Sequence, residues 1–406
     1  MDKQTLLALI DRHPEKTALS QEFYMDEDIY DRDISEIYLK SWLYAGHASE
    51  IPTVGDWFLF ELAGESVIIV RSAEDEINAL LNVCRHRGSK ICLEKKGCNK
   101  ILVCPYHAWA YGLDGQLRGA PYMADDFDKS KISLKKIKTE LLEGLIYINF
   151  AEQPASFTPI RNALTECLTP YGLHKAKVAH KQTYSIAANW KLSVENYTEC
   201  YHCAPSHPEY SRGHSLSKPN SRSTELMKDV MSRAELCGLS NKSFNRYYLN
   251  AEGFGADYGY ERYAMWPGHS TGSDDGKPVA PLMGDIKGYD GGTTDFQVGP
   301  VCFALAYCDH VVIYRFTPTG LGTSECEISW LVNADAEEGK DYNLDRLIWL
   351  WDVTTLADKR IIESNASGVS SRYYKPGPLS EMEDFTWMFL SWYLDSIKPP
   401  EKDVVP

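Results

Sequence analysis

Four residues between positions 84 and 107 limit the folds that this chain can adopt. The first pair, Cys84 and His86, belongs to the run C-R-H-R-G, and the second pair, Cys104 and His107, belongs to the run C-P-Y-H. Each pair combines one sulfur donor with one nitrogen donor, two side-chain types that bind metals. Gly88 allows a tight turn after the first pair. We therefore expect two loop tips that bring four metal-binding side chains together.

The four donors suit an iron–sulfur centre better than a zinc ion. Two thiolates can hold one iron and two neutral imidazoles the other, a Rieske [2Fe–2S] arrangement that raises the reduction potential to roughly −150 to +300 mV. Zinc also accepts two cysteines and two histidines, but zinc modules favour C-x2–4-C paired with H-x3–5-H. We predict a Rieske cluster that Trp109 and Tyr111 shield from water. Its ligands are Cys84, His86, Cys104 and His107.

Composition favours a cytoplasmic enzyme of two domains. The 406 residues suffice for two cores, and the net charge of −15 argues against nucleic acid or an anionic membrane as a partner. No run approaches about 20 apolar residues, and the N-terminus does not resemble a signal peptide. Cysteines outside the cluster motif, such as Cys167 and Cys237, are expected to be reduced and buried. Whether Cys92 and Cys98 pair is left open.

The chain divides into three parts, and its fold class is predicted to be α+β. Residues 1–44 form a helical segment that packs on the catalytic domain, residues 45–150 form a small all-β domain that carries the metal ligands, and residues 151–406 form the catalytic domain. A proline-containing stretch, 151–159, is predicted to be the linker. Predicted strands in the β domain are 57–62, 66–71, 77–83, 101–105 and 145–150.

A second group of metal-binding side chains begins the third part, in the run from Asn189 to His207. His202 and His207 are five positions apart, so an unbroken helix would separate them by about 140°. We expect Pro205 to end the helix and let His207 turn back toward the same ion. With one carboxylate from elsewhere, two histidines form the facial triad of a non-haem Fe(II) oxygenase, which leaves positions open for O2.

The carboxylate is expected on a helix over residues 344–369, where apolar residues recur at helical spacing. Asp352, Asp358 and Glu363 are the candidates. Asp352 and Asp358 are six positions apart, about 240° around a helix, so only one of them faces a given metal. Helical geometry alone leaves the choice open.

Together, the two groups of ligands resemble those of the α subunit of the Rieske non-haem iron oxygenases, over nearly the whole chain. The resemblance implies a START-like (helix-grip) catalytic domain with a central antiparallel sheet. In that family an Asp, followed five positions later by Glu, completes the triad, and Asp358 and Glu363 match this pattern. The family also has an acid that bridges the first iron histidine to a Rieske histidine of a neighbouring subunit. That acid is Glu199 here, where most ring-hydroxylating members have Asp.

The run E-N-Y-T-E-C-Y-H-C-A-P is most similar to the branch that oxidises quaternary ammonium compounds, which includes carnitine oxygenases and glycine betaine or proline betaine demethylases. Runs that begin at Trp266, Asp309 and Trp351 are similar to the same branch. The resemblance implies a homotrimer that hydroxylates an N-methyl group, so that formaldehyde is released. The chain has no dinucleotide fingerprint, so electrons from NAD(P)H are expected to arrive through a separate flavin and iron–sulfur reductase.

A quaternary ammonium group binds aromatic faces, and a substrate carboxylate binds an arginine or a hydroxyl. Arg262 and Arg315 are candidates for the carboxylate, although each also suits a structural ion pair. Aromatic candidates for the pocket are Tyr201, Tyr210, Phe244, Tyr247, Tyr248, Phe254, Tyr258, Tyr260, Tyr263, Trp266, Phe303 and Tyr307.

Three alternatives use the same motifs. The chain could be an aromatic ring-hydroxylating dioxygenase or an O-demethylase with a flatter, uncharged pocket. It could hydroxylate a choline- or carnitine-type substrate without loss of carbon. It could also be a Rieske electron carrier fused to a START-like binding domain, which would hold about two irons per chain instead of about three.

Overall fold

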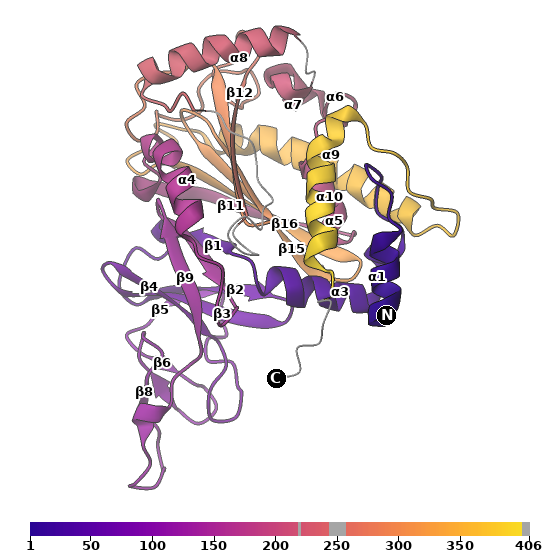
Figure 1. The fold of residues 1–406 in the computed structure, drawn as a ribbon. Helices are drawn as coiled ribbons and strands as arrows, with labels where there is room; N and C mark the ends of the chain where they lie inside the picture. Colours follow the sequence, from indigo (N-terminus) through magenta and orange to yellow (C-terminus); the bar gives the residue numbers. More distant parts are fainter. Residues whose placement is uncertain (218–220, 243–256, 400–406) are drawn as a thin grey trace.

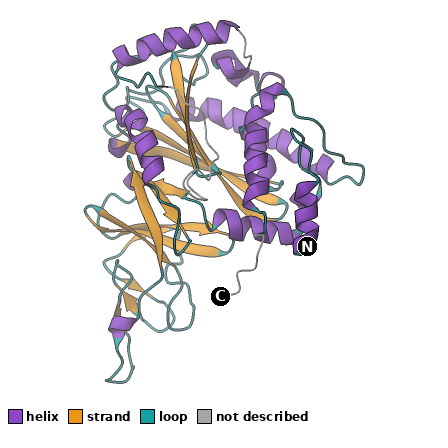
Figure 2. Ribbon diagram, viewed as in Figure 1, coloured by secondary structure: helices purple, strands orange, loops and turns teal. Residues whose placement is uncertain are grey.

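The computed structural model describes residues 1–217, 221–242 and 257–399, which form two parts (Figure 1). The smaller part consists of strands and loops and lies at lower left in Figure 1. The larger part is a sheet with helices packed around it, and the predicted α+β class is confirmed (Figure 2). Within the described residues, no helix is long and apolar enough to cross a bilayer.

The smaller part contains a seven-stranded antiparallel sheet in the order β1-β10-β9-β4-β3-β2-β5 and a small sheet in the order β6-β7-β8. The predicted strands 57–62, 66–71, 77–83 and 145–150 are present within two residues at either end. The strand predicted over 101–105 has only two residues, because Cys104 begins a ligand loop. The strands are β1 (Leu43–His47), β2 (Asp56–Leu62), β3 (Glu65–Ala73), β4 (Glu76–Leu81), β5 (Lys96–Cys98), β6 (Leu102–Val103), β7 (Ala110–Tyr111), β8 (Leu117–Gly119), β9 (Lys136–Leu142) and β10 (Leu145–Asn149).

The larger part is built on a six-stranded antiparallel sheet in the order β11-β16-β15-β14-β13-β12. Its strands are β11 (Ala176–Ile186), β12 (Tyr258–Ala264), β13 (Gly292–Val298), β14 (Cys302–Ala306), β15 (Val311–Gly320) and β16 (Thr323–Asn333). The long helix α9 (Leu344–Val369) has the predicted bounds, and Asn343 caps it by accepting from the N–H of Arg346. This helix packs against α5 (Trp190–Tyr197), α7 (Pro208–Gly213) and β11.

The N-terminal segment contains α1 (Lys3–Asp11), α2 (Glu22–Met25), α3 (Glu27–Arg32) and a π-helical turn (Asp33–Tyr38). Its apolar side chains share one core with the catalytic sheet and with α10 (Asp384–Ser396). Asp33 anchors the segment, since its buried carboxylate pairs with Lys191 and accepts from Trp190 and Tyr393. A buried ion pair is stable only when its remaining hydrogen bonds are also made, as they are here.

Two proline positions differ from the prediction. The linker is shorter than expected, because α4 (Thr158–Leu168) already contains Pro159 in its first turn, where a missing N–H costs nothing. Pro205 does not end a helix: α5 ends at Tyr197, and Pro205 lies inside the short α6 (Cys203–Ser206). His207 ends α6 and directly precedes Pro208, the first residue of α7.

The helical segments not yet named are one α-helix and several 3-10 turns. The remaining α-helix is α8 (Ser221–Ala234). Single 3-10 turns are Ala48–Glu50, Lys129–Lys131, Thr169–Tyr171, Leu173–Lys175, Ser215–Ser217, Glu235–Cys237 and Glu381–Glu383.

Candidate functional site

The two loops with the predicted cluster ligands have the same backbone hydrogen-bond pattern. In the first loop, the N–H of Gly88 donates to the carbonyl of Cys84 at 2.9 Å. In the second, the N–H of Ala108 donates to the carbonyl of Cys104 at 3.1 Å. The fourth residue after each cysteine has a positive φ, 79° at Gly88 and 57° at Ala108. Two matched turns thus present one Cys-and-His pair each.

The four predicted ligands lie in two different environments. Cys84 and Cys104 are buried, while His86 and His107 are exposed, with their ring centroids 4.6 Å apart. Trp109 stacks on His86 at 4.8 Å, as expected of a residue that shields the cluster. Cys92 and Cys98 both have free thiols. Thiol donors on the inside and imidazole donors on the outside fit a Rieske cluster whose histidine side faces out.

The hydroxyl group of Tyr111 contacts the sulfur of Cys84. The hydroxyl oxygen lies 3.2 Å from Sγ of Cys84 and accepts a hydrogen bond from the N–H of Arg85 at 3.0 Å. Because the hydroxyl accepts from that N–H, its own proton is available to the sulfur. Hydrogen bonds to cluster sulfurs tune the reduction potential.

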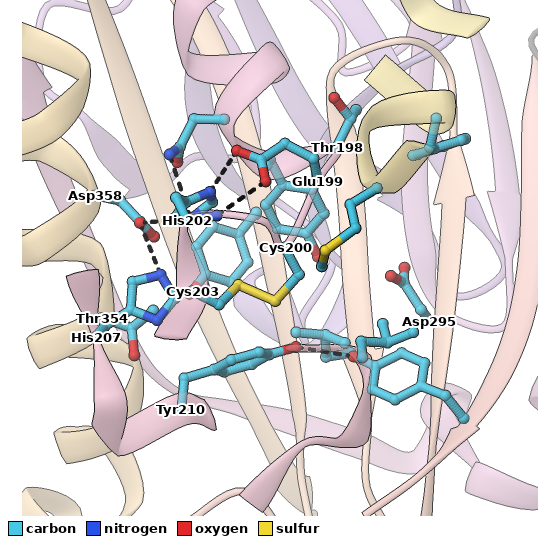
Figure 3. A pocket seen from close by; sticks show the side chains of 18 of the residues that line it. Thr198, Glu199, Cys200, His202, Cys203, His207, Tyr210, Asp295, Thr354 and Asp358 are labelled. Atoms are coloured by element: carbon cyan, nitrogen blue, oxygen red, sulfur yellow. Dashed lines mark hydrogen bonds and ion pairs between the residues drawn. A yellow bond between two sulfur atoms is a disulfide. The ribbon is translucent and has the colours of Figure 1, made fainter. Parts of the chain in front are cut away.

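In the larger part, His202, His207 and Asp358 converge on one point (Figure 3). Oδ1 of Asp358 lies 3.2 Å from Nε2 of His202 and 3.0 Å from Nε2 of His207. The histidines flank α6 and the aspartate comes from the middle of α9. Two imidazoles and one carboxylate at such distances form the donor set of a 2-His-1-carboxylate metal site.

Unsatisfied polar atoms at this point test whether a metal fits. Both ring nitrogens of the buried His207 and Oδ1 of Asp358 are buried and lack a properly oriented hydrogen-bond partner. Burial lowers the pKa of His202, but the nearby carboxylates of Asp358 and Glu199 outweigh it and raise the pKa to about 9. Burial raises the pKa of Asp358, but the two histidines outweigh it and hold the pKa of that carboxyl below its ordinary value. A cation would satisfy Nε2 of His207 and Oδ1 of Asp358, so the residues fit an iron ion.

The two competing carboxylates lie elsewhere on α9. Asp352 accepts from the hydroxyl of Tyr184 at 2.7 Å, on the side of α9 that packs against β11. Glu363 accepts from the N–H of Ala187 at 2.9 Å. Both have structural partners away from the two histidines, so Asp358 is the carboxylate of α9 that meets them.

Glu199 adjoins the same point and is held by its own loop. Its Oε1 accepts from Nδ1 of His202 at 2.5 Å, and its Oε2 accepts from the N–H groups of Tyr201 and His202. The Glu199 and His202 side chains are 13% and 14% exposed, and Tyr201 beside them is 58% exposed. The carboxylate therefore orients the imidazole from a position close to the protein surface.

A cavity of about 350 Å³ opens over these residues. Buried aromatic side chains wall it: the predicted Tyr210 and Tyr263, and in addition Tyr314 and Trp351, which the sequence did not single out. The remaining described candidates, Tyr201, Tyr258, Tyr260, Trp266, Phe303 and Tyr307, do not line it, and Phe244, Tyr247, Tyr248 and Phe254 lie outside the described residues.

Four further acidic side chains line the cavity and were missed from the sequence: Glu381 and Asp384 near the start of α10, and two on the sheet. Glu261 on β12 and Asp295 on β13 are direct cross-strand partners. Figure 3 shows Asp295 on the side of the cavity away from Asp358. No local pattern marks the two acids on the sheet, because their proximity depends on the register of two strands that are far apart in sequence.

Both candidate arginines are engaged in ion pairs away from the cavity. Arg262 pairs with Asp290 in the core, and Arg315 pairs with Glu327 at 3.2 Å. Neither lines the cavity, so the structural ion pair that the sequence allowed for each arginine is confirmed.

A disulfide joins Cys200 and Cys203 directly beside His202 (Figure 3). Sequence reasoning missed this bond, although the C-x-x-C spacing of the run C-Y-H-C was a usable signal. Both cysteines line the cavity.

Comparison with known proteins identifies a known domain in each part of the chain. Residues 41–138 match the Rieske [2Fe-2S] domain, and residues 173–398 match the ring hydroxylating alpha subunit (catalytic domain). A glycine betaine monooxygenase oxygenase subunit of Pseudomonas aeruginosa is 36% identical over 383 residues, which cover 93% of this chain and 88% of the relative. A carnitine monooxygenase oxygenase subunit of Escherichia coli is 28% identical over 87% of this chain and 84% of its own.

Solved structures agree on the fold. A quaternary ammonium Rieske monooxygenase in complex with L-carnitine matches 95% of this chain and 97% of its own with a TM-score of 0.69, at 21% identity. Naphthalene 1,2-dioxygenase from Rhodococcus sp. matches 98% and 99% with the same TM-score, at 20% identity. The domain pair implies a Rieske cluster, a mononuclear iron and electrons from a reductase. The chain belongs to the family of ring-hydroxylating α subunits with a Rieske domain and is a Rieske-type oxygenase.

Proposed function

We propose that this oxygenase hydroxylates an N-methyl group of a betaine-type quaternary ammonium compound. The observation that carries the proposal is the composition of the cavity, where aromatic faces and acidic side chains surround the candidate iron site. The relatives named above, a glycine betaine monooxygenase subunit and a carnitine monooxygenase subunit, support the same substrate class.

Recognition of the ammonium group follows from the walls of the cavity. A trimethylammonium group cannot donate a classical hydrogen bond, so it is held by cation–π attraction to ring faces and by methyl packing. Tyr210, Tyr263 and Trp351 supply such rings. Glu261 and Asp295 add a negative potential, which favours a cation over an uncharged aromatic ring.

The substrate carboxylate needs a different group, because neither Arg262 nor Arg315 lines the cavity. Among the described lining residues, Asn196 and Thr354 can donate from an amide and a hydroxyl group. We assign the carboxylate to this polar group, and the ammonium group to the aromatic walls.

The candidate metal ligands would serve the oxidation of the N-methyl group. His202, His207 and Asp358 would hold iron, which when bound supplies the activation of O2. Overall, the N-methyl compound, O2, two electrons and two protons give an N-hydroxymethyl compound and water. The N-hydroxymethyl compound then breaks its C–N bond to release formaldehyde, a proton and the demethylated amine.

Electrons would enter through the Rieske cluster held by Cys84, His86, Cys104 and His107. In Figure 1, the loops around β6 and β8 lie at the opposite end of the view from α6 and α7. We therefore infer that His107 of one subunit delivers electrons to Glu199 and His202 of the next, in a closed homotrimer. A separate reductase would draw them from NAD(P)H, and the assembly would act in the cytoplasm.

Product analysis tests the proposal. The purified chain, loaded with iron and supplied with an electron-transfer reductase and NAD(P)H, is offered glycine betaine, proline betaine, carnitine, choline and a set of aromatic acids. We expect one formaldehyde per betaine consumed. Oxidation of only the aromatic acids would overturn the substrate class, and hydroxylation of a substrate without formaldehyde would overturn N-demethylation.

A further inference from the structure

The Cys200–Cys203 disulfide lies next to the candidate iron site and has no part in the function proposed above. Its two Cα atoms are 4.9 Å apart, and the bond encloses Tyr201 and His202 in a four-residue loop. Cys203 is 4% exposed, and both cysteines line the cavity (Figure 3). The described chain has other free thiols, such as Cys237, but this pair adjoins the metal-binding histidines.

Cys203 is placed beside both metal-binding histidines. Its Sγ lies with one ring nitrogen each of His202 and His207 in a group whose atoms are all within 4.8 Å of one another. Asp358 does not belong to that group, although its Oδ1 lies 3.2 and 3.0 Å from Nε2 of the two histidines. The two histidines therefore have two candidate partners for a metal, the Asp358 carboxylate and the Cys203 sulfur.

The disulfide decides whether the sulfur of Cys203 is available as a donor. A sulfur in a disulfide is uncharged and already bonded to a second sulfur, whereas a metal binds the thiolate. Reduction by a dithiol moves two electrons and two protons to the bond, which gives two thiols here and one disulfide in the reductant. The thiol of Cys203 then loses its proton to solvent when the sulfur binds a metal.

We propose that the Cys200–Cys203 pair is a redox switch that selects the metal of the mononuclear site. This inference rests on the proposed ligand set of His202, His207 and Asp358, and it is independent of the substrate. With the disulfide intact, two histidines and one carboxylate leave coordination positions open and suit Fe(II). After reduction, Cys203 offers a sulfur donor beside the two histidines, and this sulfur–nitrogen set suits Zn²⁺.

The switch is reversible by a simple oxidant. Hydrogen peroxide takes two electrons and two protons from the two thiols, which restores the disulfide and gives two molecules of water. Cys200 serves as the resolving partner in this scheme: it forms the bond with Cys203 but does not belong to the metal-binding group. The two cysteines therefore have different roles, and this difference can be tested.

Zinc-edge X-ray absorption of the full chain tests the switch without depending on turnover. Protein with its cluster assembled and its mononuclear site empty receives one equivalent of Zn²⁺, either as purified with the disulfide or after reduction by a thiol-free phosphine. We expect a zinc–sulfur shell at about 2.3 Å only in the reduced protein. We also expect reduction to tighten zinc binding at least tenfold, measured by chelator competition. Equal zinc environments in both states would overturn the inference.

Three variants determine which cysteine supplies the sulfur donor. Cys200→Ser leaves Cys203 as a permanent thiol, so it should show the sulfur shell with or without reductant. Cys203→Ser should show none in either state. Cys237→Ser, which changes a free thiol elsewhere, should behave like wild type. A sulfur shell that persists in Cys203→Ser would contradict the role of Cys203.

The test of the redox switch can fail independently of the test of the proposed function. If the iron-loaded chain releases formaldehyde from a betaine but reduced protein lacks the sulfur shell, the switch is wrong and the function stands. If the sulfur shell appears but no betaine is consumed, the switch stands and the substrate class is wrong. Loss of zinc binding in both states of wild type would overturn the shared ligand set.

Discussion

Glu199 accepts a hydrogen bond from Nδ1 of His202 at 2.5 Å, and this contact orients the imidazole whose Nε2 faces Asp358. The same carboxylate is anchored by the N–H groups of its own loop. Glutamate is one methylene longer than aspartate, and the anchoring fixes where its oxygens lie. Glu199 and both metal-binding histidines therefore come from one short stretch of chain, and α9 adds Asp358.

Replacement of this carboxylate tests its role. Glu199→Gln should retain both metal centres and slow electron transfer from the cluster to the iron site about 10- to 100-fold, since an amide cannot accept from two imidazoles as a carboxylate does. Single-turnover oxidation of the reduced cluster in the presence of substrate and O2 measures the rate, with iron content as the control. Glu199→Asp should recover part of the rate. Normal transfer in Glu199→Gln would refute the bridge.

Asp358 should be needed for the third iron. Asp358→Ala removes the donor that lies between the two histidines, so the iron content should fall from about three to about two per chain while the cluster spectrum is unchanged. The matched control is Asp352→Ala, six positions earlier on the same helix, which loses its contacts with Tyr184 and Gln182. Retention of three irons in Asp358→Ala would move the assignment to another carboxylate.

Tyr111 should raise the potential of the cluster. Tyr111→Phe deletes the hydroxyl 3.2 Å from the Cys84 sulfur, a contact that stabilises the more negative, reduced cluster. Loss of one such hydrogen bond, worth about 1 kcal/mol, should lower the potential by about 50 mV. A redox titration followed by electron paramagnetic resonance measures the shift. Tyr122→Phe, at a fully exposed tyrosine, should leave the potential unchanged.

Asp295 should contribute to cation recognition. Asp295→Asn keeps the shape of the side chain and removes its charge, so we expect KM for a betaine to rise about tenfold, equivalent to about 1.4 kcal/mol, with a small change in kcat. Steady-state formaldehyde release measures both constants. Asp335→Asn removes an exposed charge outside the cavity and is the control. An unchanged KM in Asp295→Asn would exclude the acid from binding.

His214 should make the fold sensitive to acid. Burial lowers the pKa of this histidine to about 4, while Nε2 contacts the hydroxyl of Tyr307 at 2.7 Å. The neutral ring is favoured in the folded chain, so its stabilisation is complete above the unfolded pKa of about 6.5 and declines as the pH falls. Between pH 7 and pH 5, wild type should lose about 2 kcal/mol more than His214→Gln, measured by urea unfolding. Equal losses would contradict the assignment.

Local signals explain which features could be predicted. The helix over 344–369 was found with its bounds, because Asn343 is a strong capping residue and the apolar spacing is regular. The cluster loops were found because their ligands are close in sequence. The end of α5 at Tyr197 was not found, because Pro205 was expected to end that helix. Pro205 instead lies in the first turn of a separate short helix, where proline is tolerated.

The missed residues depend on distant parts of the chain. Glu261 and Asp295 meet through strand pairing, and β13 is buried along its whole length, so alternation gives no clue to which side chains face a cavity. Tyr314 and Trp351 read as ordinary core aromatics until the sheet and α9 are packed together. Such contacts are set by the tertiary fold and not by any short pattern.

The matched turns around Gly88 and Ala108 have a consequence for the direction of electron flow. Both place a cysteine in the protein interior and a histidine on the outside. The sulfur side of the cluster is thus insulated by protein, and the imidazole edges are its contact with other molecules. A reductase and, in the proposed homotrimer, a neighbouring subunit would then both have to reach this small face.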